Sequence, residues 1–374
     1  MHEPPVLRQI DETHVLHRGR RLVYFGGSDY LRMSWHPKVR SAVSAAAAEL
    51  GINSAASRST TGNQPVYGEL EARLKRFFRV PAVTVVSAGY FAPLIAAQAL
   101  ASQYSAVLLD ERSHACLRDA AQLTGLPVRE FPHRDPEGLG KRMNQVKGKG
   151  RLLVMTDGLF STTGDAAPVR EYMERLSDRG TLLIDDAHGV GALGANGRGT
   201  VEWSGANLRN VIVTGTLSKA LGSYGGFVLG PASLRAAIFD HSRMFIGNTP
   251  VPPPCAAGSM ASLEVLREEG ESRRQRLVAT VRRIRAVLGE WDPSQRDAPG
   301  PMMAVVPRDT SANNRLRRAL LEADIYPPLI RYAGGPAPMF YRLAVSSEHS
   351  VEQVDALESA LRAGLGTKPT HQRR

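Results

Sequence analysis

Six short apolar runs, rich in branched side chains, alternate with amphipathic segments through the middle of this 374-residue chain. The runs cover residues 83–86, 106–109, 152–155, 182–184, 211–213 and 227–229. The segments between them have apolar positions at helical spacing and include residues 93–100, 114–123 and 169–176. Strands that alternate with helices predict an α/β fold, in which a mostly parallel sheet is covered on both faces.

Polar residues follow within three positions of the ends of five of these runs. They are Ser87, Asp110, Asp157, Asp185 and the segment 216–219. Ligands of such sheets bind at the carboxyl ends of the strands, so we expect these five positions to converge there.

The proline-rich segment 250–254 would break a helix or a central strand. It predicts a boundary between a large α/β domain of residues 51–250 and a smaller C-terminal α+β domain of residues 251–366. The smaller domain is expected to hold a helix near 255–288, strands near 303–306 and 342–345, and a last helix near 351–365. Residues 1–50 are expected to form an N-terminal arm that packs with it, and residues 367–374 a basic tail.

The net charge of +11 is compatible with nucleic acid, an anionic membrane surface or acidic substrates as partners. Arginines gather in residues 267–285, where they alternate with apolar residues at helical spacing, and we interpret them as the solvated face of an amphipathic helix. Neither an aromatic platform nor zinc-finger spacing accompanies the charge, which disfavours a nucleic-acid partner. A CoA thioester or an anionic lipid surface would suit the charge better.

Cys116 and Cys255 lie far apart, without a CxxC pair or metal-ligand spacing, so we expect neither a disulfide framework nor a metal site. The first residues show no basic patch followed by an apolar core, and no stretch approaches the length of a membrane span. These observations favour a globular enzyme in the cytoplasm.

One lysine, Lys219, stands among small and hydroxylated residues after the apolar run 211–213. A partly desolvated lysine loses its proton readily and forms Schiff bases with aldehydes such as pyridoxal phosphate (PLP). PLP also needs a carboxylate at its pyridinium nitrogen, and Asp185 follows the run 182–184 in a suitable place. The alternative interpretation is that Asp185 and His188 cap a strand-to-helix turn and that Lys219 is a surface lysine.

The chain resembles the α-oxoamine synthase family of fold-type I PLP enzymes. The resemblance extends from about residue 24 to residue 365. It is most specific in seven segments that follow the family's order, namely residues 87–90, 110–114, 157–161, 184–189, 215–219, 245–249 and 341–343.

A phosphate dianion is bound by backbone N–H groups at a helix start and by hydroxyl donors, both of which residues 87–90 and the lysine loop offer. The resemblance implies that His114 stacks on the cofactor ring, that His188 and Ser161 lie at its phenolic oxygen, and that Arg342 binds the substrate carboxylate. It places Lys219, Asp185, His188 and His114 in catalysis. It places the phosphate near Ala88, Gly89, Tyr90, Thr216 and Ser218, and near Thr249 of a neighbouring subunit.

The chain departs from the family's usual residues at several positions. Ser28, in the substrate region, replaces an asparagine that helps to hold the substrate, and Arg32 replaces a glycine. The other departures are Tyr67 for histidine, Pro93 for asparagine, Asp157 for glutamate and Phe340 for the first arginine of an Arg-x-Arg pair. These changes bear on which substrates enter the site.

The resemblance implies a homodimer with shared active sites that condenses an amino acid with an acyl thioester, carried by CoA or a carrier protein. Loss of CO2 would leave an α-amino ketone. One alternative keeps PLP but makes the protein an aminotransferase, a decarboxylase or a retro-aldol lyase that uses no thioester. Another is a non-catalytic basic binding protein, which the intact Lys219 and Asp185 disfavour.

Overall fold

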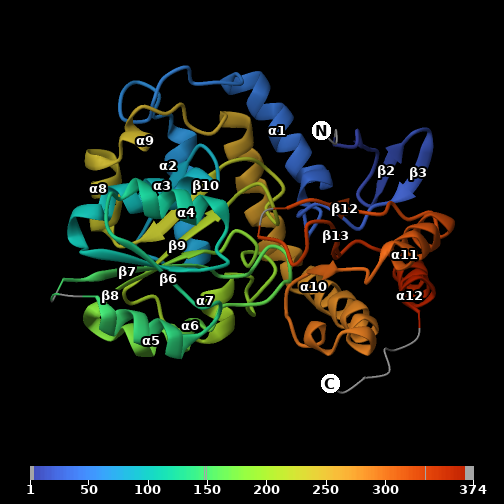
Figure 1. Cartoon of the computed structure of the whole chain (residues 1–374). Coiled ribbons are helices and arrows are strands. Elements are labelled where there is room, and N and C mark those ends of the chain that lie inside the picture. The colour runs from blue at the N-terminus through green and yellow to red at the C-terminus, as the bar shows by residue number, and fades with distance from the viewer. Residues whose placement is uncertain (1–3, 147, 149, 333, 367–374) are drawn as a thin grey trace.

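The computed structural model describes residues 4–146, 148, 150–332 and 334–366, so the predicted basic tail lies outside the described residues. The chain forms two lobes (Figure 1). The larger contains a seven-stranded sheet, and the smaller combines both ends of the described chain with two three-stranded sheets.

The central sheet confirms the predicted α/β class. Its order is β4-β10-β9-β8-β7-β5-β6, and β10 is antiparallel to both of its neighbours, whereas the other pairs are parallel. All six predicted runs are strands. The strands are β4 (Ala82–Val86), β5 (Ala106–Asp110), β6 (Val128–Phe131), β7 (Leu152–Asp157), β8 (Gly180–Asp185), β9 (Val211–Thr216) and β10 (Gly226–Gly230).

Helices cover both faces of this sheet, which explains why its inner strands are continuously apolar. Successive strand residues belong to two different clusters; Leu152 and Val154 pack in one, Leu153 and Met155 in the other. The second cluster is completed by α3 (Phe91–Leu100), α4 (Ala115–Leu123), α8 (Ala232–His241) and α9 (Arg243–Ile246). The first is completed by α2 (Pro65–Phe78), α5 (Pro136–Gln145), α6 (Val169–Leu176), α7 (Thr200–Ser204) and part of α10 (Pro253–Trp291).

The smaller lobe holds the strand that carries Arg342. Its antiparallel sheet has the order β11-β13-β12, and the N-terminal strands form a second sheet, joined to it where Val23 pairs with Ile325. The helix α1 (Pro37–Leu50) packs along α10. The remaining elements are β1 (Arg8–Gln9), β2 (His14–His17), β3 (Arg20–Val23), β11 (Met302–Val305), β12 (Leu329–Ile330), β13 (Phe340–Ala344), α11 (Thr310–Glu322) and α12 (Val351–Leu365).

The proline-rich segment starts a helix. Pro253 and Pro254 occupy the first turn of α10, where the missing N–H groups cost nothing, and the helix runs on for 39 residues. None of the helices in the described ranges is long and apolar enough to cross a membrane.

The interpretation of the arginines in α10 as a solvated face is wrong for two of them. Arg273 and Arg285 are buried. Arg285 donates to the backbone carbonyls of Thr163, Gly300 and Met302, and also to that of Gln295. Helical spacing could not reveal this, because the acceptors come from other segments of the chain.

Candidate active site

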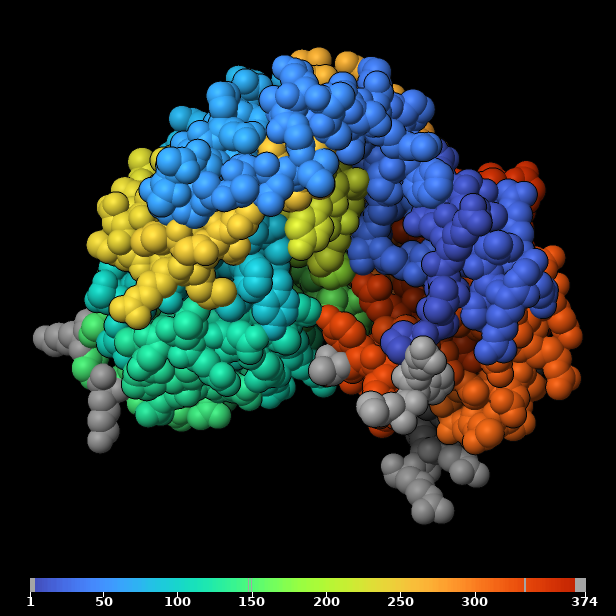
Figure 2. All heavy atoms as spheres, turned by 90° about the horizontal axis from the view of Figure 1, so that it is seen from above, coloured from blue at the N-terminus to red at the C-terminus, as the bar shows by residue number. Residues whose placement is uncertain are grey.

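The predicted site residues meet in a cleft between the lobes. Figure 2 shows the recess between the large lobe and the lobe that carries the chain's two ends. A cavity there is lined by His114, Asp157 and Ser161 from the large lobe and by Tyr332 from the smaller lobe. The carboxyl end of β7 therefore faces Tyr332, which follows β12, and the charge of Arg342 in β13 acts on His188 and Lys219, which follow β8 and β9.

Lys219 lies in a tight turn after β9. The turn is closed by hydrogen bonds from Gly222 N–H to the Lys219 carbonyl and from Ser223 N–H to the Leu217 carbonyl. Burial, together with the nearby Arg342, lowers the pKa of Lys219 to about 8, against the opposing influence of Asp185. A substantial share of Lys219 is therefore the neutral, nucleophilic amine near neutral pH.

Two adjacent carboxylates, Asp185 and Asp186, have different hydrogen-bond partners. Both oxygens of Asp186 accept hydrogen bonds from Thr200, one from its N–H and one from its hydroxyl, at 2.6 Å. Asp185 ends β8, where one oxygen accepts the Ala187 N–H and the other lies 3.1 Å from Cys116 Sγ. Asp186 thus holds the loop in place, and Asp185 is the carboxylate that faces the lysine.

His114 caps α4, and its ring points toward the same space. Its ring Nδ1 accepts the Cys116 N–H, and its backbone N–H donates to the Asp157 carboxylate. Burial lowers the pKa of His114, as does the nearby Lys219. The ring is therefore neutral near pH 7, as befits a residue that stacks on an aromatic cofactor.

His114, Cys116 and Asp185 lie close enough to share a metal ion, with their ligand atoms within 4.8 Å of one another. Two features disfavour a cation there. Burial and neighbouring carboxylates raise the pKa of the Cys116 thiol, so it keeps its proton, and the Lys219 ammonium lies nearby. The protonated thiol instead lies between His114 Nδ1, at 3.0 Å, and the Asp185 carboxylate, at 3.1 Å.

His188 is buried and hydrogen-bonded to a residue that the sequence did not single out. Its Nδ1 lies 2.6 Å from the hydroxyl of Tyr30. Burial lowers the pKa of His188 well below its usual value, and the cations Lys219 and Arg342 act in the same direction. The imidazole is therefore neutral.

Arg342 reaches the site from β13. Its Nε donates to the Ser161 carbonyl at 2.8 Å, and the Ser28 hydroxyl and the Arg342 guanidinium both lie near the Tyr30 hydroxyl. The Ser161 hydroxyl faces Tyr332. The structure thus brings Arg342, Ser28 and Ser161 together, although their roles stay predictions.

A cradle for an anion lies between β4 and α3. The N–H groups of Gly89 and Tyr90 meet no acceptor among the described residues, and they lie at the start of α3. A Cβ on Gly89 would lie 2.6 Å from the Cβ of Thr216, and one on Gly226 would lie 2.5 Å from the Ala88 carbonyl oxygen. Only glycines allow this close approach, so the residues present fit a phosphate.

The side chains of three predicted phosphate ligands, Tyr90, Thr249 and Ser218, do not point into this cradle in an obvious way. The Tyr90 hydroxyl donates to Asp119, so its backbone N–H is the group left for an anion. Thr249 is exposed, and its neighbour Asn248 donates to Ser87 Oγ of the same chain at 2.7 Å. Thr249 therefore lies beside the cradle on the surface, and Ser218 is exposed in the lysine loop.

The departures from the family pattern lie mostly outside the centre of the site. Arg32 is buried in the left-handed region with φ +52°, and its guanidinium lies 3.4 Å from the Tyr24 carbonyl. The left-handed backbone accounts for the glycine that is common at this position. Tyr67 donates to the Val251 carbonyl, and Pro93 is buried in the first turn of α3.

Tyr30 and Cys116 are the two functional candidates that sequence reasoning missed. Neither lies inside the seven segments that carry the resemblance, but both stand next to residues already considered, Tyr30 two residues after Ser28 and Cys116 two residues after His114. That proximity was the available signal, but their partners lie 158 and 69 residues away in sequence.

Comparison with known proteins identifies the family. The family model described as aminotransferase class I and II matches residues 20–361. The chain belongs to this family. The 8-amino-7-oxononanoate synthase of Methylococcus capsulatus is 37% identical over 363 residues, which cover 95% of this chain and 92% of that protein. The same-named protein of Pseudomonas putida is 36% identical over 360 residues, which cover 96% and 92%.

Solved structures agree with this assignment. Serine palmitoyltransferase of Sphingomonas wittichii matches with a TM-score of 0.87 at 29% identity, over 95% of this chain and 90% of that chain. Serine palmitoyltransferase of S. paucimobilis, solved with a bound PLP-myriocin aldimine, matches with a TM-score of 0.88 at 28% identity, over 96% and 93%. The chain is a PLP-dependent α-oxoamine synthase, and the resemblance seen in the sequence is confirmed.

Proposed function

We propose that this enzyme joins the α-carbon of a small amino acid, alanine in the first place, to the acyl group of a thioester. The free thiol and CO2 leave, and an α-amino ketone remains. The curated relatives are named for 8-amino-7-oxononanoate, a nine-carbon α-amino ketone with a methyl group on its amine carbon. Alanine and a seven-carbon acyl group that ends in a carboxylate give this product.

The observation that carries the proposal is the meeting of Arg342 and Lys219 across the cleft. The positive charge of Arg342 lowers the pKa of Lys219, so the two groups lie close together. Arg342 can hold an α-carboxylate while Lys219 faces the α-carbon, because an α-amino acid separates these positions by one bond.

Each residue then has a distinct task. Bound PLP supplies the electron sink for negative charge at the α-carbon. Asp185 would hold the proton on the ring nitrogen of bound PLP, His188 would donate to its ring oxygen, and His114 would cover the ring face. Lys219, with a pKa of about 8, takes up and returns a proton near neutral pH.

Two further features belong to the proposal. A homodimer with shared sites is supported by the exposed Thr249 beside Ser87, since a second subunit could reach the same cradle there. A reducing compartment such as the cytoplasm is supported by Cys116 and Cys255, which are both free thiols. Light scattering of the PLP-loaded enzyme at micromolar concentration checks the dimer, and a monomer that keeps PLP would contradict shared sites.

Release of thiol from acyl-CoA tests the reaction. Alanine, serine and glycine should be crossed with acyl-CoAs of different chain length, with and without a terminal carboxylate, and with the matching carrier-protein thioesters. Fast thiol release with alanine, in step with CO2, is expected. An enzyme that binds PLP and turns amino acids into keto acids or amines, without using any thioester, would instead be an aminotransferase or decarboxylase.

A further inference from the structure

The hydroxyl of Tyr30 stands at the junction of three site residues. It lies 2.6 Å from His188 Nδ1, and the Ser28 hydroxyl and the Arg342 guanidinium lie near the same oxygen. Tyr30 is fully buried, and His188 is 7% exposed. Water therefore cannot replace these contacts freely.

Proton counting favours one direction for the short hydrogen bond between Tyr30 and His188. A guanidinium only donates, so Arg342 cannot accept the phenolic hydrogen, whereas the Ser28 hydroxyl can donate to the phenol oxygen. Burial raises the pKa of Tyr30 and lowers that of His188, so the phenol keeps its hydrogen and the imidazole is neutral. When Ser28 and Arg342 both donate to the phenol oxygen, the phenol donates its own hydrogen to Nδ1, and the ring hydrogen of His188 is then on Nε2.

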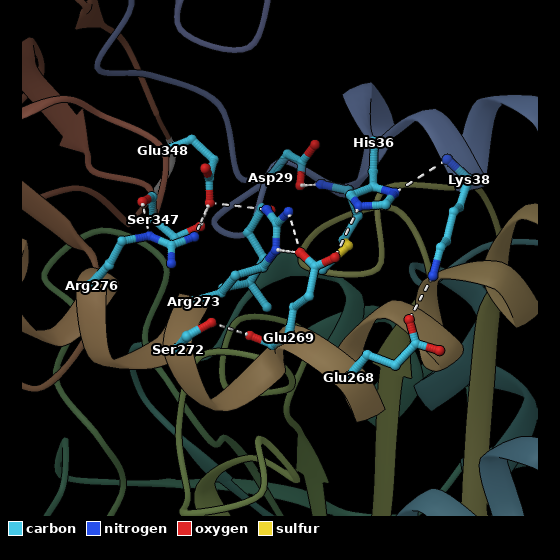
Figure 3. A network of polar contacts seen from close by, with 12 residues as sticks. Asp29, His36, Lys38, Glu268, Glu269, Ser272, Arg273, Arg276, Ser347 and Glu348 are labelled. Atoms are coloured by element: carbon cyan, nitrogen blue, oxygen red, sulfur yellow. Dashed lines mark hydrogen bonds and ion pairs between the residues drawn. The ribbon is translucent and has the colours of Figure 1, made fainter.

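The segment that carries Tyr30 is held firmly. The Tyr30 carbonyl accepts the Ser347 N–H at 2.9 Å, and the Leu31 carbonyl accepts Arg273 Nη1 at 3.0 Å. Figure 3 shows Arg273 between Glu269 and Glu348, with Asp29 close by. A hydroxyl on so fixed a backbone can select one orientation of the His188 ring.

We propose that Tyr30 is a positioning residue, which fixes the hydrogen of His188 on Nε2 and strengthens the hydrogen bond that this nitrogen donates to the ring oxygen of PLP. A nitrogen that accepts a hydrogen bond withdraws electrons from the opposite N–H, so the two bonds reinforce each other. Nε2 has no partner among the described protein residues and is free for the cofactor. The inference rests on the proposed function only in that PLP occupies this site.

The visible absorption of bound PLP reports on this hydrogen bond. Negative charge on the ring oxygen is greatest in the high-pH form of the lysine-bound cofactor, so a strong donor favours that form and lowers the midpoint of the spectral pH titration. Tyr30→Phe should raise the midpoint by about half to one pH unit, the equivalent of one ordinary hydrogen bond. The charged or titratable groups around His188, namely Lys219, Arg342 and His114, are unchanged in this variant.

Tyr104→Phe is the matched control. Tyr104 is also a buried tyrosine, and its hydroxyl donates to Thr181 Oγ1 at 2.7 Å, at the start of β8 and far from the site. The Tyr104→Phe variant should leave the midpoint of the spectral pH titration unchanged. Equal shifts in the two variants would mean that loss of any buried hydroxyl disturbs the spectrum, and would overturn the inference.

A double-mutant cycle with His188→Gln completes the test. In the His188→Gln background, Tyr30→Phe should cause no further shift, because the residue through which Tyr30 acts is gone. A shift of undiminished size there shows that Tyr30 acts by another route and overturns the inference. If Tyr30→Phe fails to fold, ¹⁵N spectra of the wild-type apoenzyme decide, with the His188 signal assigned by its loss in His188→Gln. A hydrogen on Nδ1 would then contradict the inference.

The spectral titrations use the PLP-loaded enzyme and the ¹⁵N spectra use the apoenzyme, and neither measurement depends on acyl transfer. Thiol release from acyl-CoA is measured separately on the same preparations. An enzyme that shows the predicted shift without thiol release would disprove the proposed function and leave the role of Tyr30 standing, and the reverse result would do the opposite.

Discussion

Two clusters of charged residues contact the segment 28–34, one around Arg273 and one in the active site. They differ in how the charges are paired. In the cluster of Figure 3, Arg273 meets Glu269 at 2.8 Å and Glu348 at 2.9 Å, so each charge has an opposite charge beside it. In the active site, Lys219 lies near a second cation, Arg342, as well as near Asp185, and burial lowers the pKa of Lys219 to about 8.

The difference distinguishes residues that position the backbone from residues that take part in the reaction. Matched charges satisfy one another and fix the backbone that presents Tyr30, whereas the two neighbouring cations Lys219 and Arg342 remain available to a cofactor and a substrate. We therefore expect changes in the active-site cluster to alter spectra and turnover at nearly constant stability, and changes in the Arg273 cluster to do the reverse.

Lys219→Ala should have the largest effect. It removes the amine that binds the cofactor and moves the proton, so turnover should fall by at least about a thousand-fold, while the protein stays folded. Borohydride should fix the cofactor on Lys219 in the wild type only, which peptide mass spectrometry can check. Attachment to another lysine would remove Lys219 from the mechanism.

Asp185→Asn and Asp186→Asn should give opposite results. Loss of the Asp185 charge removes the partner of the ring nitrogen, and we expect a loss of about a hundred- to a thousand-fold in turnover at normal stability. Asp186→Asn instead leaves the Thr200 N–H facing an amide, which should cost about 1 to 3 kcal/mol of unfolding free energy. Turnover and denaturant melts of both variants would show whether the assignments are reversed.

Arg342→Ala should remove recognition of the carboxylate. Truncation of a buried charge pair costs about 2 to 4 kcal/mol, or roughly one and a half to three powers of ten in affinity. Spectral titration of the PLP-loaded enzyme should show weaker binding of alanine, and unchanged binding of ethylamine, which lacks the carboxylate. Equal weakening of both ligands would mean that Arg342 does not read the carboxylate.

The strongly patterned parts of this molecule could be predicted from its sequence. The six apolar runs became strands because helices cover both faces of the sheet. The edge strand β6 escaped prediction because only Phe131 of its four residues is buried, so it has no apolar run. Asp185 and Lys219 were found because their chemistry needs particular residue types at strand ends.

Contacts between distant segments could not be predicted in this way. The burial of Arg285 depends on carbonyl groups from four other positions, and helical spacing treats every arginine as a surface residue. The sequence suggested that Arg32 affects which substrates enter the site, but its side chain lies by the Tyr24 carbonyl. The Tyr30 contact with His188 joins two segments that only the folded chain brings together.

The pH dependence of cofactor uptake should reveal the shifted pKa of Lys219. Burial disfavours the ammonium, so the neutral amine forms around pH 8 instead of near its usual 10.5. The rate at which apoenzyme takes up PLP should rise about tenfold per unit below pH 8, as the amine fraction does, and level off above it. Stopped-flow absorbance measures this rate, and a rise that continues to pH 10 would show an ordinary lysine.

Replacing Arg273 should have the smallest effect on chemistry and a clear effect on stability. Its side chain is 10% exposed but its partners Glu269 and Glu348 are 40% and 22% exposed, so solvent screens the pairs and the loss in Arg273→Leu should be about 1 to 2 kcal/mol. Arg276→Leu is the control, because Arg276 shares Glu348 but is 48% exposed and should cost less than about 0.5 kcal/mol.

Both variants should be followed by denaturant unfolding and by the spectral midpoint of bound PLP. The stability loss in Arg273→Leu should come with a midpoint shift well below that of Tyr30→Phe, because Ser347 still holds the Tyr30 carbonyl. A shift as large as that of Tyr30→Phe would mean that the paired cluster also tunes the cofactor, and the division between positioning and chemistry would have to be redrawn.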